Sequence, residues 1–365
     1  MRLRGILEGF KPYEWESSTL DIAKKFGLDP DKILRFDTNT MPFHPERLLK
    51  ILNQKLLNLR VNEYPEPSYL ELREALAEYL GRSVDEITVT AGCDEALDIL
   101  SKVFIDPKTK VLVSTPTYAM YRVVVEAMGG KIVNIQRKPD FSDDVEKIVE
   151  VVDDKTRIIF LCNPNNPTAN PTSEETVLRL LKETDCAIVV DESYFEFYGK
   201  SFVNLIDKYE NLIILRTFSK AFSLAGARVG YMVANRKTID ILNIMRPPNS
   251  LTVISLALAK IALENLEWVK ENVKKVIEER EKLIEDLKKI DGVHVYPSVT
   301  NFLLVRFVKG DVNHIHRKLL EKGIITRNVG SHPMLENCLR ITVRKREENM
   351  VLVENLERIL SELGG

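Results

Sequence analysis

Several features that would place the chain in a common class of protein are absent from its sequence. Only four cysteines occur in 365 residues, none of them in a Cys-x-x-Cys pair, so we expect reduced thiols in a cytoplasmic protein. No apolar run approaches the length of a membrane span, and the N-terminus lacks the apolar core of a secretory signal. The sequence therefore predicts a protein without a membrane partner.

An excess of either charge is also absent. Lys and Arg number 52 against 54 Asp and Glu, which gives a net charge of −2 and argues against general nucleic-acid binding. His314 and His316 are two positions apart in a predicted helix and face different sides, so we predict no metal site. Neither a Gly-x-Gly-x-x-Gly nor a Gly-x-Ser-x-Gly motif occurs.

What the sequence does contain is a regular alternation of short apolar runs and helical patterns from about residue 46. This alternation predicts an α/β fold with a mostly parallel sheet that helices cover on both faces. A long charged helix is expected near 266–290, followed by a compact α+β unit. We predict an N-terminal arm at 1–40, a large domain at 41–262 and a small domain at 263–365. The strands predicted for the large domain are Ile87–Thr90, Lys110–Ser114, Lys131–Ile135, Arg157–Cys162, Cys186–Val190, Leu212–Leu215 and Val229–Ala234.

The segment 217–228 carries the strongest chemical signal. It follows the predicted strand at 212–215 and contains Lys220, with two hydroxyl side chains just before it. A desolvated lysine has a pKa below its ordinary value of about 10.4 and can be a neutral amine that attacks a carbonyl. An isolated lysine at such a turn would simply be exposed, so the interpretation depends on the residues that accompany Lys220.

Polar groups also follow two other predicted strands. One strand is followed by Asp191–Tyr194 (Asp-Glu-Ser-Tyr) and another by Asn163–Thr168 (Asn-Pro-Asn-Asn-Pro-Thr). Because ligands bind at the carboxyl ends of strands in open α/β sheets, we expect these groups and Lys220 to meet at one edge. An Asp-Glu pair after an apolar strand also occurs in ATPases, but the Gly-Lys-Ser at 199–201 lacks the first glycine of a phosphate-binding loop.

These blocks, together with the segment Ser-Lys-Ala-Phe-Ser-Leu-Ala-Gly-Ala-Arg at 219–228, resemble the signature sequences of fold-type I aminotransferases, which use pyridoxal phosphate. Within that group the chain is most similar to the histidinol-phosphate aminotransferases. The similarity extends from Lys11-Pro-Tyr13 to Arg340-Ile-Thr-Val343. It implies a large doubly wound domain and a smaller α+β domain.

The resemblance implies catalytic roles for Lys220, Asp191 and Tyr194. Lys220 would carry the cofactor and, once released, act as a general base. Asp191 would keep the pyridine nitrogen protonated. Tyr194 and Asn166 would donate hydrogen bonds to the phenolic oxygen of the cofactor, while Tyr118 would stack on its ring.

The turn at 91–96, which opens a predicted helix, is the expected site of the cofactor phosphate. Amides at a helix start, together with the helix dipole, bind phosphate well, although such a turn with Asp94 as an N-cap is also common. The resemblance further implies a homodimer, in which Tyr64 reaches the cofactor of the neighbouring subunit. The cofactor-binding set that it implies is Gly92, Cys93, Asp94, Tyr118, Asn166, Asp191, Tyr194, Thr217, Ser219, Lys220, Arg228 and Tyr64.

On the substrate side, the resemblance points to Tyr13, Asn39, Arg327 and Arg340. Histidinol phosphate is a phosphorylated amine without a carboxylate, whereas 2-oxoglutarate is a dicarboxylic keto acid. One site must therefore accept either anion in turn, and guanidinium groups bind both. The implied activity is transamination of L-histidinol phosphate with 2-oxoglutarate, a step of histidine biosynthesis.

Departures from the family pattern leave alternatives open. Asn39-Thr-Met-Pro42 replaces the usual Asn-Glu-Asn-Pro, Ala169 replaces a usual glycine, and Arg344 stands where glycine is common. An arginine at 344 is reminiscent of threonine-phosphate decarboxylases, so that activity and an aromatic amino-acid aminotransferase remain alternatives. A pyridoxal-phosphate-binding regulator would need a DNA-binding module, for which the arm is too short and insufficiently basic.

Overall fold

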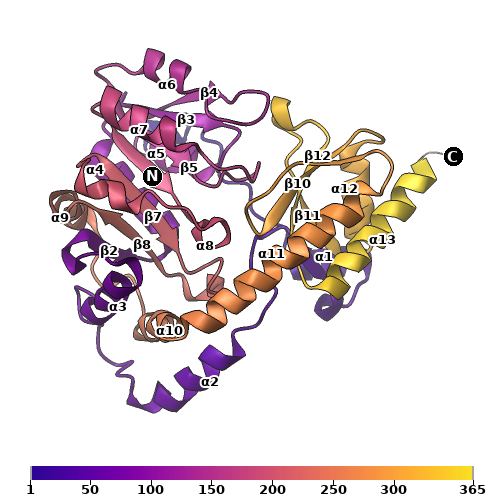
Figure 1. Ribbon diagram of the computed structural model, residues 1–365, viewed down its shortest axis with the longest axis horizontal. Helices are drawn as coiled ribbons and strands as arrows, with labels where there is room; N and C mark the ends of the chain where they lie inside the picture. Colours follow the sequence, from indigo (N-terminus) through magenta and orange to yellow (C-terminus); the bar gives the residue numbers. More distant parts are fainter. Residues whose placement is uncertain (1, 364–365) are drawn as a thin grey trace.

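Two sheets joined by one long helix form the framework of the protein (Figure 1). The computed structural model describes residues 2–363. The larger sheet has the strand order β2-β8-β7-β6-β5-β3-β4, and the smaller has the order β1-β11-β12-β10-β9. Within residues 2–363, no helix is both long enough and apolar enough to cross a membrane.

The larger sheet is parallel except for β8, which runs antiparallel to β2 and β7. Every residue of β2, β6, β7 and β8 is buried, as expected for strands that helices cover on both faces. The strands are β2 (Ile87–Thr90), β3 (Lys110–Thr115), β4 (Lys131–Gln136), β5 (Thr156–Cys162), β6 (Ala187–Asp191), β7 (Leu212–Thr217) and β8 (Gly230–Ala234).

Amphipathic helices cover the two faces of this sheet with separate apolar clusters. Side chains of α4, α5 and α9 pack on one face, whereas those of α6 and α7 pack on the other. Several of these helices begin after a side chain that caps a backbone N–H, such as Ser173 before α7. The helices of this part are α2 (Glu46–Lys55), α3 (Leu70–Leu80), α4 (Gly92–Phe104), α5 (Met120–Ala127), α6 (Val145–Val151), α7 (Glu174–Glu183), α8 (Phe195–Tyr198), α9 (Arg236–Met245) and α10 (Val253–Leu263).

The smaller sheet lies beyond α11 (Leu266–Lys288), next to the C-terminal helix (Figure 1). Its first strand comes from the N-terminal part of the chain and pairs in parallel with β11, while its other pairs are antiparallel. Its elements are α1 (Thr19–Phe26), β1 (Leu34–Phe36), β9 (Val293–Val295), β10 (Phe302–Phe307), α12 (Val312–Glu321), β11 (Ile324–Asn328), β12 (Cys338–Thr342) and α13 (Arg346–Leu363).

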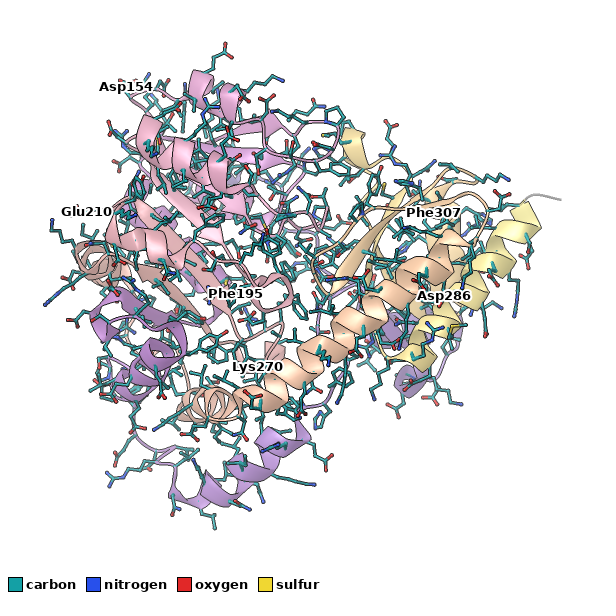
Figure 2. The ribbon with its side chains drawn as sticks, viewed as in Figure 1. Asp154, Phe195, Glu210, Lys270, Asp286 and Phe307 are labelled. Carbon is teal, nitrogen blue, oxygen red and sulfur yellow. The ribbon has the colours of Figure 1, made fainter. Side chains whose placement is uncertain are left out.

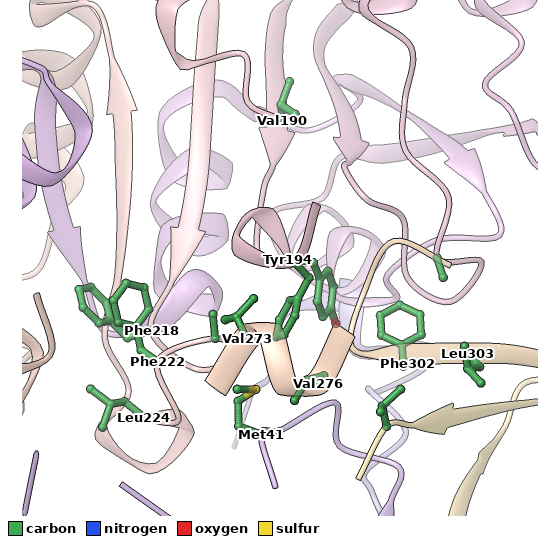
Figure 3. Close-up of a cluster of buried hydrophobic side chains, with 14 of the residues drawn as sticks. Met41, Val190, Tyr194, Phe218, Phe222, Leu224, Val273, Val276, Phe302 and Leu303 are labelled. Carbon is green, nitrogen blue, oxygen red and sulfur yellow. The ribbon is translucent and has the colours of Figure 1, made fainter. Parts of the chain in front are cut away.

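The helix α11 connects the two sheets through one continuous apolar cluster. Figure 2 shows Lys270 near its start, beside the larger sheet, and Asp286 near its end, beside the smaller one. In Figure 3, Val273 and Val276 of this helix lie between Phe218, which directly follows β7 of the larger sheet, and Phe302 in β10 of the smaller sheet. The two sheets therefore share buried apolar contacts.

The structure agrees with the predicted strands of the larger sheet to within two residues at each end. It adds two strands that the sequence analysis did not predict, β1 and β11, which pair with each other. β1 has only three residues, and β11 passes from two isoleucines into Thr-Arg-Asn, so neither stands out in the sequence. The two strands pair with each other although they lie far apart in the chain.

Candidate active site

A cavity of about 140 Å³ lies where the carboxyl ends of β5, β6 and β7 face the smaller sheet. The turns after β2 and β3 and the N-terminal arm complete its wall. This position is the one expected for a ligand site in an open α/β sheet. The lining residues are Tyr13, Glu16, Thr38, Asn39, Cys93, Asp94, Tyr118, Cys162, Asn166, Asp191, Ser193, Tyr194, Thr217, Ser219, Lys220, Arg228 and Arg340.

Lys220 follows β7 and is buried in the wall of this cavity. Its Nζ donates a hydrogen bond to the backbone oxygen of Thr38 at 3.1 Å. Burial, reinforced by the positive charge of Arg340, lowers the pKa of Lys220 from 10.5 to about 8. With this pKa, roughly a tenth of the amine is uncharged at pH 7 and available as a nucleophile or base.

Asp191 ends β6, and three donors surround its carboxylate. The Tyr121 hydroxyl donates to Oδ2 at 2.9 Å, while the backbone N–H and the hydroxyl of Ser193 donate to Oδ1 at 3.0 and 2.5 Å. Burial raises the pKa of Asp191, and the Ser193 and Tyr121 hydrogen bonds oppose that rise. The three hydrogen bonds fix the position of this carboxyl group at the floor of the cavity.

Asn166 and Tyr194 each keep a hydrogen-bond donor available. Arg340 Nη1 donates to Asn166 Oδ1 at 2.7 Å, so the Asn166 amide nitrogen remains to donate elsewhere. Asn39 Nδ2 donates to the Tyr194 hydroxyl oxygen at 3.0 Å, which leaves the Tyr194 proton free to bind an acceptor. Burial raises the pKa of Tyr194, so that proton is retained.

At the opposite end, the start of α4 and the segment after Lys220 form a corner that contains a guanidinium group and two hydroxyl side chains. Arg228 donates to Ser219 Oγ at 3.3 Å and to Asp94 Oδ2 at 3.1 Å. A Cβ on Gly92 would lie 2.5 Å from the Arg228 guanidinium, so only glycine leaves room for this approach. Thr217 contributes a further hydroxyl, bonded to Ser219 Oγ at 3.0 Å.

Two aromatic side chains close one side of the cavity. The Tyr118 hydroxyl donates to Asp94 Oδ1 at 3.2 Å, and its ring meets the ring of Tyr13 edge-on, with centroids 6.4 Å apart.

Cys93, at the start of α4, lies against Ser193, with its Sγ 3.5 Å from the hydroxyl oxygen. Burial raises the pKa of the Cys93 thiol, so it is protonated and unreactive.

Three residues predicted for the site are not among the lining residues. Gly92 lies behind Cys93, against Arg228. Arg327 pairs with Arg340 across β11 and β12 and donates to the backbone oxygen of Glu14 at 3.0 Å. Tyr64 is 85% exposed on the loop before α3.

The sequence analysis missed five residues that the structure places at or behind the cavity wall. They are Glu16, Thr38, Tyr121, Cys162 and Ser193. Cys162 is the last residue of one predicted strand and Ser193 lies three positions beyond another, and neither side chain carried a distinct signal. Glu16 and Thr38 reach the cavity because the N-terminal segment folds back across it, which no local pattern predicts.

The donor set fits a phosphorylated aromatic aldehyde. The Arg228 corner suits a phosphate, Asp191 suits a protonated ring nitrogen, and Lys220 lies among them as an amine able to attack an aldehyde. Within the described part of the chain, Nε of the buried Arg340 has no hydrogen-bond partner, which leaves a donor for an anionic substrate group.

Comparison with known proteins gives consistent matches along nearly the whole chain. The family model "Aminotransferase class I and II" matches residues 31–356. The chain is 39% identical over 363 residues to the histidinol-phosphate aminotransferase of Caldanaerobacter subterraneus subsp. tengcongensis, covering 98% of this chain and 99% of that protein.

Two solved structures share the fold and much of the length. Histidinol-phosphate aminotransferase from Sinorhizobium meliloti, in complex with pyridoxal-5'-phosphate, gives a TM-score of 0.90 at 26% identity, covering 99% of this chain and 98% of that one. L-threonine-O-3-phosphate decarboxylase from Porphyromonas gingivalis gives 0.78 at 26% identity, covering 90% of this chain and 100% of that one.

Proposed function

Because the chain belongs to the aminotransferase class I and II family, we propose that it is a pyridoxal-phosphate-dependent enzyme that transfers the amino group of L-histidinol phosphate to 2-oxoglutarate. The products are imidazole-acetol phosphate and glutamate, and the step belongs to histidine biosynthesis. The relative from Caldanaerobacter supports this substrate. The observation that carries the proposal is the meeting of Lys220, Asp191 and Arg340 at one cavity.

The residues around the cavity divide the binding of the cofactor among them. Arg228, Ser219, Thr217 and the first amides of α4 would hold its phosphate, and the Asp191 carboxylate would accept a hydrogen bond from its protonated ring nitrogen. Asn166 and Tyr194 would donate to its phenolic oxygen with the protons that their other contacts leave free, and Tyr118 would stack on its ring.

When bound, pyridoxal phosphate supplies an aldehyde that accepts the substrate amine and a protonated ring that draws electrons from the substrate Cα. Lys220 Nζ, partly uncharged because of its lowered pKa, removes the proton from Cα. Asp191 keeps the ring nitrogen protonated throughout, held in place by the Tyr121 hydroxyl. The hydroxyl of Ser193 donates to the same carboxylate.

The substrate's anionic group binds on the smaller-sheet side of the cavity. Arg340 is buried there, and Arg327 lies beside it in the register of β11 and β12. Two adjacent guanidinium groups suit a phosphate in one half-reaction and a carboxylate in the other. Tyr13 and Asn39 complete this side of the cavity.

Arg344, which suggested a decarboxylase, lies elsewhere. Its guanidinium forms an ion pair with Glu348 in the first turn of α13 at 3.0 Å, and its backbone N–H donates to Asn349 Oδ1. Among residues 2–363, it is not one of those that line the cavity. The basis for preferring the lyase is therefore weakened.

The active protein is proposed to be a cytoplasmic homodimer. Exposed apolar side chains occur in the segment between α2 and α3, where Leu57 is 98%, Val61 66% and Tyr64 85% exposed. Such a surface is typical of an interface that a partner covers. A second copy that covers this segment would bring Tyr64 of one subunit to the cofactor phosphate of the other.

The test uses the purified holoprotein and L-histidinol phosphate without a keto acid. We expect the visible absorbance of the bound cofactor to fall, and 2-oxoglutarate to restore it. An unchanged spectrum with histidinol phosphate, beside a fall with glutamate, would contradict the substrate assignment. Release of carbon dioxide from threonine phosphate without a keto acid would point to the decarboxylase instead.

A further inference from the structure

An acidic side chain of the N-terminal arm faces the substrate cavity. Glu16 lines the cavity together with Tyr13, whose hydroxyl donates to Glu16 Oε1 at 3.0 Å. Burial and this neighbouring carboxylate raise the pKa of Tyr13 to about 12, so the donated proton stays on the phenol. The pair forms the arm's contribution to the wall.

The arm is held in place on both sides of this pair. Three guanidinium groups donate to backbone carbonyls of the segment 11–17, one from α5, one from β11 and one from β1. The bonds are Arg122 Nη2 to the Lys11 oxygen at 2.9 Å, Arg327 Nη2 to the Glu14 oxygen at 3.0 Å, and Arg35 Nη1 to the Ser17 oxygen at 2.8 Å. The segment 11–17 is therefore a fixed part of the cavity wall.

Glu16 has fewer ion-pair and hydrogen-bond partners than the two other carboxylates of the cavity. Asp94 forms an ion pair with Arg228, and Asp191 accepts three hydrogen bonds. Within residues 2–363, the Glu16 carboxylate accepts one hydrogen bond, from the neutral hydroxyl of Tyr13. A carboxylate can accept about four. Glu16 thus retains both a negative charge and acceptor capacity.

The substrate of the proposed function has groups that match the two charged sides of this cavity. Its phosphate suits the guanidinium of Arg340, and its imidazole carries one N–H when neutral and two when protonated. Given the proposed function, we infer that Glu16 determines specificity by accepting an N–H of the substrate imidazole. The same carboxylate repels the second carboxylate of glutamate, which shares the site in the other half-reaction.

The variant that tests this inference is Glu16→Gln, because an amide oxygen can still accept the Tyr13 hydroxyl and only the charge is removed. Single-turnover rates of the holoprotein are measured with L-histidinol phosphate and, separately, with L-glutamate. We expect the efficiency with histidinol phosphate to fall about 10-fold, as for loss of a charge-assisted hydrogen bond, while that with glutamate holds or rises. Glu8→Gln, in the exposed part of the arm, is the control and should leave the efficiencies with histidinol phosphate and with glutamate unchanged.

The possible outcomes separate the inference from the proposed function. If wild type reacts with histidinol phosphate and Glu16→Gln matches it, or if both efficiencies fall equally, Glu16 only supports the wall and the inference is wrong. If wild type is inert toward histidinol phosphate but reacts with glutamate, the proposed substrate is wrong, and the inference falls with it.

Discussion

At the scale of single residues, the chemistry depends on what burial does to Lys220. Its amine loses the hydration that favours the charged form, and the nearby guanidinium of Arg340 adds repulsion. The same lysine in solvent would be almost fully protonated at neutral pH. The fold therefore prepares the amine before any ligand arrives.

Replacement of Lys220 by alanine is expected to abolish transamination, with a loss of about 10⁴-fold or more, because the amine that carries the cofactor and moves the proton is gone. Turnover of histidinol phosphate measures the loss, and circular dichroism checks that the fold is retained. Lys208→Ala, at an exposed position, is the control. Full activity in the Lys220 variant would refute the assignment of this residue.

The lowered pKa of Lys220 also predicts how stability depends on pH. In the cofactor-free protein the pKa is about 8, below its ordinary 10.5, so the unfolded state binds the proton more tightly. Lys220→Met should therefore stabilise the cofactor-free protein by about 3 kcal/mol at pH 7, and the gain should vanish as the pH rises above 10.

Urea unfolding of both cofactor-free proteins at pH 7 and at pH 10 measures this difference, with Lys208→Met as the exposed control. A gain that stays constant across this range would mean that the methionine acts by packing alone, and that Lys220 is not destabilised by its charge.

At the scale of elements, the geometry of the site depends on where the strands end and on how closely β8 approaches the start of α4. Gly230 starts β8, and a Cβ there would lie 2.6 Å from the backbone carbon of Gly92, in the first turn of α4. The glycine thus lets the helix start sit directly against the strand, where its amides face the cavity.

Gly230→Ala should displace this helix start, lowering stability by about 2 kcal/mol and weakening the binding of pyridoxal phosphate. Cofactor titration and urea unfolding report the two effects. In Gly226→Ala the added Cβ meets nothing within 4 Å, so that variant should match wild type in both measurements. Unchanged cofactor affinity in Gly230→Ala would show that α4 does not hold the phosphate.

Elements also show what the sequence could and could not predict. The mostly parallel α/β fold is confirmed, because buried strands such as β7 are continuous apolar runs. The antiparallel direction of β8 was not foreseen, since an apolar run carries no direction. The strand β1 was missed because three residues form a strand only through pairing with β11, almost three hundred positions later.

The same distinction applies to the candidate site. Lys220, Asp191 and Asn166 follow strands, so the rule for strand ends brings them to one edge, and the structure places all three around the cavity. Glu16 has no such marker, because its position depends on an arm that crosses from one side of the molecule to the other. The catalytic and cofactor-binding roles of Lys220, Asp191 and Asn166 stay predictions.

At the scale of the whole molecule, the two sheets share one apolar cluster along α11. The division into an arm at 1–40 and domains at 41–262 and 263–365 stays a prediction. The cavity takes residues from all three segments, so the site requires the full chain. Arg340, for example, reaches Asn166 at 2.7 Å across the gap between the sheets.

The proposed dimer predicts an effect on both assembly and activity. Leu57→Glu places a charge on a side chain that is 98% exposed and should cost nothing in an isolated subunit. In a dimer it would be buried and unpaired, so we expect a shift to monomers and a large loss of turnover. Light scattering and activity, measured together, check this.

Val308→Glu is the control, because Val308 is also an exposed apolar residue, at 68%, and lies next to the smaller sheet. It should remain dimeric and active. A Leu57→Glu protein with unchanged mass and activity would exclude the segment between α2 and α3 from the interface.

The way in which the arm is held has a consequence for evolution and for redesign. The three arginines bind backbone oxygens of Lys11, Glu14 and Ser17, which every amino acid possesses, and their further contacts with arm side chains involve Glu14 and Thr19 but neither position 13 nor position 16. Side chains at 13 and 16 can therefore be exchanged while the anchoring of the segment is preserved. Substrate preference can diverge at these two positions, by natural drift or in a combinatorial library, with little change in the catalytic centre behind them.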